Sequence, residues 1–244
     1  MLMNQEQKNA FSVPAAILLG AIIIAGAIVW VLHPSSPATN PLTGPVQQNQ
    51  RVPAPAVDIK NVKTAGDPFI GQANAPVTIA YWFDYQCPFC KQDEEDVIPQ
   101  IIKNYVALGT VKIVFKDFEF LGPDSMTASL AARAVWDVAP DQFYAWHKAM
   151  YDAQGGEDSG WASKDAILTI TKGVLGQADT TKVSALMVSK LSTYTAEINA
   201  DKTEGDSLGV SGTPAMIIGK QLVVGAQPYS AFKSAIDTAL GAHN

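Results

Sequence analysis

The sequence is short of cysteine, histidine and basic residues, and each shortage excludes a class of protein. Its 244 residues include only 2 cysteines, which are too few for a disulfide-rich scaffold. The 17 Lys and Arg against 23 Asp and Glu give a net charge of −6, which argues against a nucleic-acid-binding protein, because binding phosphates requires clustered cations. Hydrophobic residues, at 48%, are too abundant for a chain that is disordered throughout.

One long apolar run lies near the N-terminus. Residues 11–32 contain no charged side chain; as a helix they would span about 33 Å, enough for the hydrocarbon core of a bilayer, which is about 30 Å thick. A cleaved signal peptide is the alternative, but its apolar region is usually about 7–15 residues long and small residues follow it, whereas His33 and Pro34 follow here. We therefore predict a cytoplasmic N-terminus at 1–10 and an uncleaved transmembrane anchor at 11–32.

The segment after this run is rich in proline. Residues 33–56 carry only Arg51 as a charged side chain, show no hydrophobic periodicity and have prolines at 34, 37, 41, 45, 53 and 55. This composition predicts an extended linker that holds a folded domain away from a membrane. A disordered tail without that role is the alternative.

The first half of the globular part, which begins near Val57, is predicted to be strand, helix, strand. Residues 77–83 and 110–115 are short runs of β-branched and aromatic residues, and the first is typical of a strand buried on both faces. Between them, apolar residues recur at helical spacing over 97–106, and Pro99 should kink this helix. Short connections then favour a right-handed βαβ unit with parallel strands.

The second half begins with helices and returns to strands. Between 123 and 205, amphipathic patterns predict no strand but helices over 125–138, 141–153, 163–175 and 180–200. Breaks between them are predicted at Gly155, Gly156 and Gly176. A hairpin over 215–218 and 222–224 precedes a last helix over 229–240.

These elements predict an α/β fold, a βαβ … ββα domain interrupted by an all-helical subdomain. The sheet domain takes residues 57–122 and 206–244, and the inserted helical subdomain takes 123–205.

Both cysteines lie where the first strand gives way to the helix. The run Cys87-Pro88-Phe89-Cys90 places the first thiol at the helix N-terminus, where unpaired N–H groups and the helix dipole favour the thiolate and lower its pKa. The spacing also lets the two sulfurs form and break a disulfide reversibly. We therefore expect Cys87 to be the nucleophile and Cys90 the thiol that resolves the mixed disulfide.

Two other uses of the cysteines fit the sequence less well. Half of a zinc site would need further Cys or His ligands, and the only histidines, His33, His147 and His243, make a poor set. An inert buried pair is disfavoured by the strand–CxxC–helix arrangement. His147 lies among aromatic residues, which indicates packing or a surface position rather than catalysis.

Four stretches of this chain resemble the DsbA family of thiol–disulfide oxidoreductases, and within it the membrane-tethered, BdbD-like branch. They are Gly71-Gln-Ala-Asn-Ala-Pro-Val-Thr-Ile79, Phe83-Asp-Tyr-Gln-Cys-Pro-Phe-Cys-Lys91, Gly209-Val-Ser-Gly-Thr-Pro214 and Gly225-Ala-Gln-Pro228. The resemblance spans about 57–242 and implies a thioredoxin fold with an inserted helical domain. It also implies a cis Thr213–Pro214 bond against the cysteines.

One position departs from the family pattern. The best-known oxidases of this family carry histidine between the cysteines, where the imidazolium helps to hold the thiolate, and Phe89 cannot do so. Asp84 and the acidic run 93–96 also add negative charge that opposes a thiolate. We therefore expect a disulfide that is not strongly oxidising, and we interpret the run 93–96 as a solvated helix face.

The predicted function is a membrane-anchored thiol–disulfide oxidoreductase in the bacterial cell membrane, with its catalytic domain outside the cytoplasm. It would oxidise reduced or unfolded secreted and envelope proteins with no cofactor beyond the redox-active disulfide, as a monomer, and the resemblance implies a membrane quinone-linked thiol oxidase as its partner. Substrates would bind at Pro88, Phe89, Thr213 and Pro214. A reductase or isomerase is the alternative within this class, and a metal-binding or scaffolding module is the alternative outside it.

Overall fold

The computed structural model describes residues 57–242. The predicted anchor at 11–32 and linker at 33–56 lie outside the described residues. Between 57 and 242, every helix is too short or too polar to cross a bilayer.

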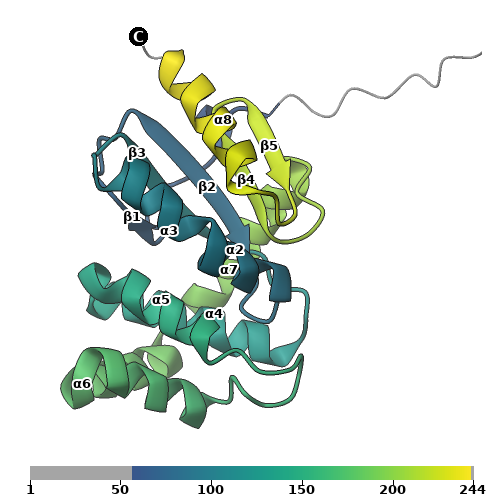
Figure 1. The fold of residues 1–244 in the computed structure, drawn as a ribbon. Helices are drawn as coiled ribbons and strands as arrows, with labels where there is room; N and C mark the ends of the chain where they lie inside the picture. The colour runs from purple at the N-terminus through teal and green to yellow at the C-terminus, as the bar shows by residue number, and fades with distance from the viewer. Residues whose placement is uncertain (1–56, 243–244) are drawn as a thin grey trace, which may run out of the picture. The chain divides into compact units, whose positions relative to one another are not determined.

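The strands form a single sheet in the order β1-β3-β2-β4-β5 (Figure 1). They are β1 (Phe69–Ile70), β2 (Val77–Phe83), β3 (Val111–Asp117), β4 (Ala215–Ile218) and β5 (Gln221–Val224). The central pair β2 and β3 is parallel, and the other neighbours are antiparallel. The parallel pair and the β4–β5 hairpin confirm the sequence prediction. Strand β1 was not predicted, because two residues are too few to show a period.

The connection between β2 and β3 is helical but divided. Helix α2 (Pro88–Asp96) ends before Val97, α3 (Ile98–Ile101) follows, and a π-helical turn (Ile102–Val106) completes the connection. Pro99 lies in the first turn of α3, where its missing N–H costs no hydrogen bond within the helix. The expected disruption at Pro99 is therefore present as a break between two helices.

The segment predicted as a helical block contains no strand. Its helices are α4 (Pro123–Val138), a 3-10 turn (Pro140–Gln142), α5 (Phe143–Asp152), α6 (Lys164–Ser189) and α7 (Leu191–Ser207). The predicted break at Gly176 is present inside α6, where φ is 79°. The predicted helix over 180–200 is wrong in extent, because a second break at Lys190 separates α6 from α7.

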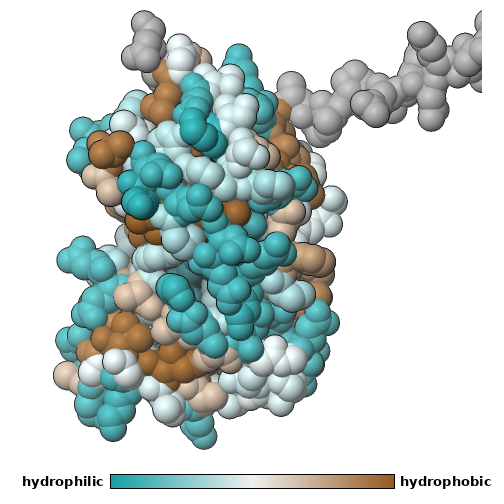
Figure 2. Space-filling model, viewed as in Figure 1, coloured by the Kyte–Doolittle hydropathy of each residue, from teal (hydrophilic) through white to brown (hydrophobic). Residues whose placement is uncertain are grey.

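The sheet is buried on both faces, as the composition of β2 predicted. Alternate residues of β2 point to opposite sides: Ile79 and Tyr81 join the large hydrophobic cluster under α2 and the inserted helices, whereas Ala80 and Trp82 join a smaller cluster. Helix α8 (Tyr229–Gly241) packs on β2, β4 and β5. On the face shown in Figure 2, hydrophobic surface gathers mainly over the end of the molecule formed by α5 and α6.

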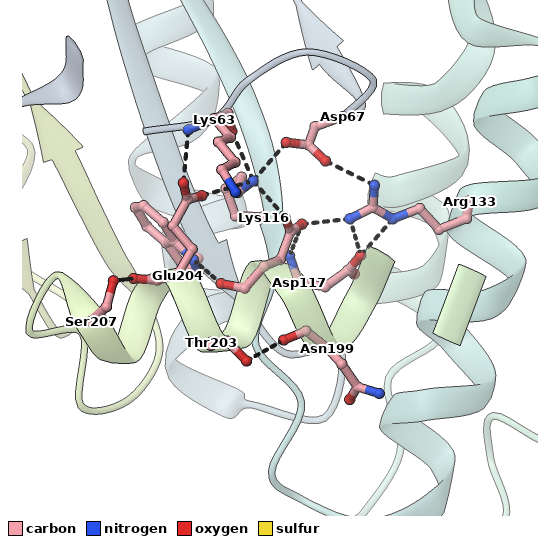
Figure 3. Close-up of polar contacts among 11 residues, drawn as sticks. Lys63, Asp67, Lys116, Asp117, Arg133, Asn199, Thr203, Glu204 and Ser207 are labelled. Atoms are coloured by element: carbon pink, nitrogen blue, oxygen red, sulfur yellow. Dashed lines mark hydrogen bonds and ion pairs between the residues drawn. The ribbon is translucent and has the colours of Figure 1, made fainter. Parts of the chain in front are cut away.

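A buried ion network joins the inserted helices to the sheet (Figure 3). Arg133 on α4 binds Asp67 at 2.9 Å, Asp117 at the end of β3 at 2.6 Å and Asp201 on α7 at 2.5 Å. Lys116 on β3 pairs with Asp67 at 2.6 Å and with Asp201. Although burial opposes it, the surrounding carboxylates raise the pKa of both cations, so both stay charged.

Candidate active site

The two cysteines lie at the junction of β2 and α2. Cys87 is the N-cap of α2, Pro88 is its first residue, and Cys90 lies in its first turn. Both cysteines are free thiols, and their exposed fractions are only 3% for Cys87 and 0% for Cys90. Pro88 and Phe89 between them are exposed, Phe89 by 59%. The buried thiols are therefore flanked by an exposed apolar edge.

The loop that leads into this junction is held by hydrogen bonds. The Asp84 carboxylate accepts from the backbone N–H of Gln86, Phe120 and Leu121 and from the Ser125 hydroxyl. The Gln154 side chain donates to the carbonyls of Tyr85 and Cys87 at 2.7 and 3.1 Å. Asp84 is thus a structural residue, and contacts from the inserted helices fix the position of Cys87.

The segment before β4 completes the site. The Thr213–Pro214 peptide bond is cis, and the Cys87 thiol donates a hydrogen bond to the Thr213 carbonyl, with 3.4 Å between sulfur and oxygen. Thr213 is half-buried and Pro214 is buried. The prediction that this bond is cis and lies beside the Cys87 sulfur is confirmed.

The two thiols differ in acidity. A hydrogen bond from the Cys90 thiol is the main reason that the pKa of Cys87 falls to about 6. Burial opposes the fall, and the Thr213 side chain and the backbone N–H groups of Cys90 and Phe89 add to it. Burial raises the pKa of Cys90 well above its usual value. Cys87 is therefore largely a thiolate at neutral pH, whereas Cys90 keeps its proton.

The expected opposition from nearby carboxylates is outweighed at Cys87. The helix N-terminus contributes as the sequence predicted, through the N–H groups of Phe89 and Cys90, but the largest contribution comes from the partner thiol. Sequence reasoning missed this contribution because it depends on the orientation of the Cys90 side chain.

The acidic run 93–96 is not a solvated helix face, so that interpretation is wrong. Asp93 and Glu94 are each only 1% exposed, while Glu95 and Asp96 face solvent. In a helix, residues three and four positions after Cys90 share its face, and this face packs against the core. Their spacing from Cys90 was the signal that could have predicted this burial, but their charge suggested a solvent-exposed position.

His147 lies in the core, as the packing interpretation predicted. It is 0% exposed and its ring contacts Phe83 and Phe115 at centroid distances of 4.9 and 4.7 Å. Its two ring nitrogens lie 2.8 Å from the Tyr85 hydroxyl and 3.1 Å from Glu94. His147 is therefore already bonded on both sides. His33 and His243 lie outside the described residues, and within 57–242 no three His, Cys, Asp or Glu side chains are grouped to hold a metal.

Comparison with known proteins agrees with this site. A family model described as Thioredoxin matches residues 63–238. The chain is 28% identical to disulfide bond formation protein D of Bacillus subtilis over 180 residues, which cover 72% of this chain and 78% of that protein.

Solved structures show the same similarity. The crystal structure of oxidised BdbD from Bacillus subtilis aligns with a TM-score of 0.68 at 25% identity, covering 76% of this chain and 98% of that one. The thiol-disulfide exchange protein alpha-DsbA2 from Wolbachia pipientis aligns with a TM-score of 0.62 at 28% identity, covering 71% and 87%. The expected thioredoxin-like fold with a helical insertion is confirmed.

Proposed function

The chain belongs to the thioredoxin family, as a DsbA-like, BdbD-like dithiol–disulfide oxidoreductase, and on this basis we propose that it introduces disulfides into secreted or envelope proteins. The observation that carries the proposal is the difference between its two thiols: Cys87 lies at the helix N-terminus with a pKa of about 6, and Cys90 lies behind it with a raised pKa. An acidic outer thiol and a protonated inner thiol suit the two steps of disulfide exchange.

The acidity of Cys87 favours oxidation of substrates over their reduction. A protein that stabilises the thiolate stabilises its own reduced form, and its disulfide then becomes a stronger oxidant. A pKa of about 6 lies between those of thioredoxin, about 7, and DsbA, about 3.5. We therefore expect a reduction potential between their values of about −270 and about −120 mV, which agrees with a disulfide of intermediate oxidising strength.

The exchange follows from these positions. A substrate thiolate attacks the Cys87 sulfur of the disulfide, the bond to Cys90 breaks, and a mixed disulfide forms. A second substrate thiolate then attacks the substrate sulfur, and Cys87 leaves as the thiolate that its surroundings stabilise. The substrate loses two electrons and the cysteine pair gains them, so the chemistry needs no cofactor besides the pair. Reoxidation falls to a separate acceptor, for which we propose a quinone-linked membrane thiol oxidase.

Substrates are proposed to bind at the edge around Cys87. Pro88 and Phe89 offer exposed apolar surface beside the thiols, and reduced, unfolded chains expose the apolar side chains that such a surface binds. Thr213 and Pro214 form the opposite side of the site, where the Thr213 carbonyl contacts Cys87. This arrangement requires only one copy of the chain, and we propose a monomer.

We propose that the catalytic domain lies outside the cytoplasm, tethered by residues 11–32 and spaced from the membrane by 33–56. The charge-free apolar run and the proline-rich segment after it support this placement. A stable catalytic disulfide also fits an oxidising compartment better than the cytosol.

Variants of the two cysteines test the assigned roles. Cys87→Ser should abolish exchange, whereas Cys90→Ser should accumulate mixed disulfides through Cys87, because the resolving thiol is gone. Non-reducing electrophoresis and mass spectrometry after incubation with a disulfide-bonded protein, whose disulfide the Cys87 thiolate attacks, would identify the trapped species. If Cys90 instead formed the adducts, or if Cys87→Ser kept its activity, the roles would be reversed or wrong.

A further inference from the structure

Two buried polar groups near the inner thiol lack hydrogen-bond partners. Asp93 is 1% exposed, and neither of its carboxyl oxygens has a partner; the buried hydroxyl of Tyr81 on β2 has none either. Buried polar groups are nearly always paired, because an unpaired one costs desolvation free energy without return. An unpaired carboxyl close to a redox-active thiol is therefore a candidate for a role in the reaction.

The geometry of α2 brings Asp93 to Cys90. The buried residues of this helix are Cys90, Asp93 and Glu94, and residues three positions apart on a helix are neighbours on one face. The charges of Cys90 and Asp93 each act on the Tyr81 hydroxyl, and the charge of Cys87 acts on Asp93. Cys90, Asp93, Tyr81 and Cys87 therefore form one cluster of interacting groups.

The charges around Asp93 favour its protonated form. Glu94 and Asp96 on the same helix and Cys87 at its N-terminus act together with burial to raise the pKa of Asp93 to about 8. No cation is among these influences on Asp93. Asp93 therefore carries a proton at neutral pH.

The groups on the neighbouring elements are uncharged or already bonded. Tyr81 faces the cluster from β2, and burial raises the pKa of its hydroxyl well above the usual value. On α5, Tyr144 and His147 bond to Glu94 rather than to Asp93. Glu94 thus has partners, and Asp93 is the carboxyl left free to exchange a proton.

Cys90 needs such a group. Its sulfur is fully buried, and burial strongly disfavours its thiolate, yet each cycle of exchange must release Cys90 as a thiolate or deprotonate it. We propose that Asp93 donates a proton to Cys90 when the disulfide opens and accepts it when the disulfide closes, through one bridging water. This inference rests on the proposed function, because it concerns the same exchange reaction.

The balance of the step is as follows. When a substrate thiolate attacks Cys87, the electron pair of the broken Cys87–Cys90 bond stays on the Cys90 sulfur, and the Asp93 proton moves to it, which leaves a carboxylate. When the pair is reoxidised, Cys87 is first joined to the sulfur of an external disulfide. An Asp93 that has lost its own proton to solvent, a fraction that grows as the pH approaches 8, takes the Cys90 proton as the Cys90 sulfur attacks Cys87, and the external thiolate leaves.

The two steps can be measured separately by treating the reduced, full-length protein with an aromatic disulfide that releases a coloured thiolate. Reduced protein should release a first equivalent as Cys87 attacks and a second equivalent as Cys90 resolves the mixed disulfide. Asp93→Asn keeps the side-chain shape but removes the proton. This variant should leave the rate of the first phase unchanged and slow the second phase about a hundredfold, which is the lower end of the rate contribution of a positioned general acid or base. The inflection near pH 8 in the second phase should also disappear.

Glu95→Gln is the matched control, since Glu95 is an exposed carboxylate on the same helix and is not among the charges that act on Asp93, and both phases should stay unchanged. A second phase of wild-type rate and pH profile in Asp93→Asn would refute the inference, and so would equal slowing of both phases, which indicates a structural defect. If the wild-type protein released no second equivalent, the proposed function itself would fail.

A measurement on the unaltered protein guards against a variant that does not fold. Carbon-13 NMR of labelled aspartate should show the Asp93 carboxyl titrating near pH 8 in the reduced protein, and this pKa should change when the cysteines are oxidised. An Asp93 carboxyl that ionises near its usual value of about 3.9 would contradict the inference.

Discussion

The acidity of the Cys87 thiol depends on groups that only the folded chain brings together. The hydrogen bond from Cys90 contributes most, and Thr213, distant in sequence, contributes after it. Because these contributions exceed the effect of burial, Cys87 is reactive although it is 3% exposed. Its neighbour Cys90, without comparable help, is inert until the mixed disulfide forms.

The pH dependence of alkylation should report this acidity. We expect the rate of Cys87 modification by iodoacetamide to rise with pH around a midpoint of about 6, because the thiolate is the nucleophile and its fraction grows as pH exceeds the pKa. Cys90→Ala removes the hydrogen bond from Cys90 to Cys87, so the midpoint of Cys87 alkylation should move to higher pH in this variant. A wild-type midpoint at the ordinary value of about 8.5 would show that the site does not activate Cys87.

At the scale of elements, α2 and the ion network both connect the sheet to the inserted helices. Helix α2 packs on α5, and its Glu94 bonds to Tyr144 and His147 there. In the ion network, Arg133 from α4 joins carboxylates of β3 and α7. The insertion is thus held to the sheet through polar contacts as well as apolar ones.

Removing the central cation should destabilise this junction. Arg133→Met leaves Asp67, Asp117 and Asp201 without their shared partner, and breaking a buried ion pair on one side typically costs about 3–5 kcal/mol. Urea unfolding followed by circular dichroism would measure the loss. Lys148→Met, which removes only an exposed pair with Asp152 on α5, is the control and should change the midpoint little. Equal effects of the two variants would mean that the network does not hold the insertion.

Hydrophobic periodicity predicted most of these elements but not their ends or their buried charges. Strand β2 was predicted from its continuous run of β-branched and aromatic residues, and helix α4 from its amphipathic period. The break at Lys190 has no glycine or proline to mark it, so the pattern ran through it. Asp93 and Glu94 were placed in solvent because sequence reasoning assigns carboxylates to the surface, whereas tertiary packing buries them.

At the scale of the whole molecule, we propose a catalytic domain that follows a membrane anchor and a linker. The proposed function requires that substrates and a reoxidant reach Cys87, and the exposed Pro88 and Phe89 lie beside it. A tether would keep the domain close to such a reoxidant.

The anchor prediction is tested by the mature N-terminus. We expect residues 11–32 to remain in the mature protein, and the chain to fractionate with membranes until detergent is added, because a charge-free apolar run of this length spans a bilayer. Mass spectrometry of the purified protein would identify the first residue. A mature N-terminus between residues 28 and 45 would show that the run is a cleaved signal peptide.

The reduction potential of the Cys87–Cys90 pair tests the central claim most directly. Equilibration with glutathione buffers, followed by quantification of thiols and disulfide, gives its value. Because the reduced form is stabilised by the Cys87 thiolate, we predict a potential above thioredoxin's value of about −270 mV. A potential at or below that value, with both cysteines isolated from cells mainly as thiols, would contradict the account and indicate a reductase.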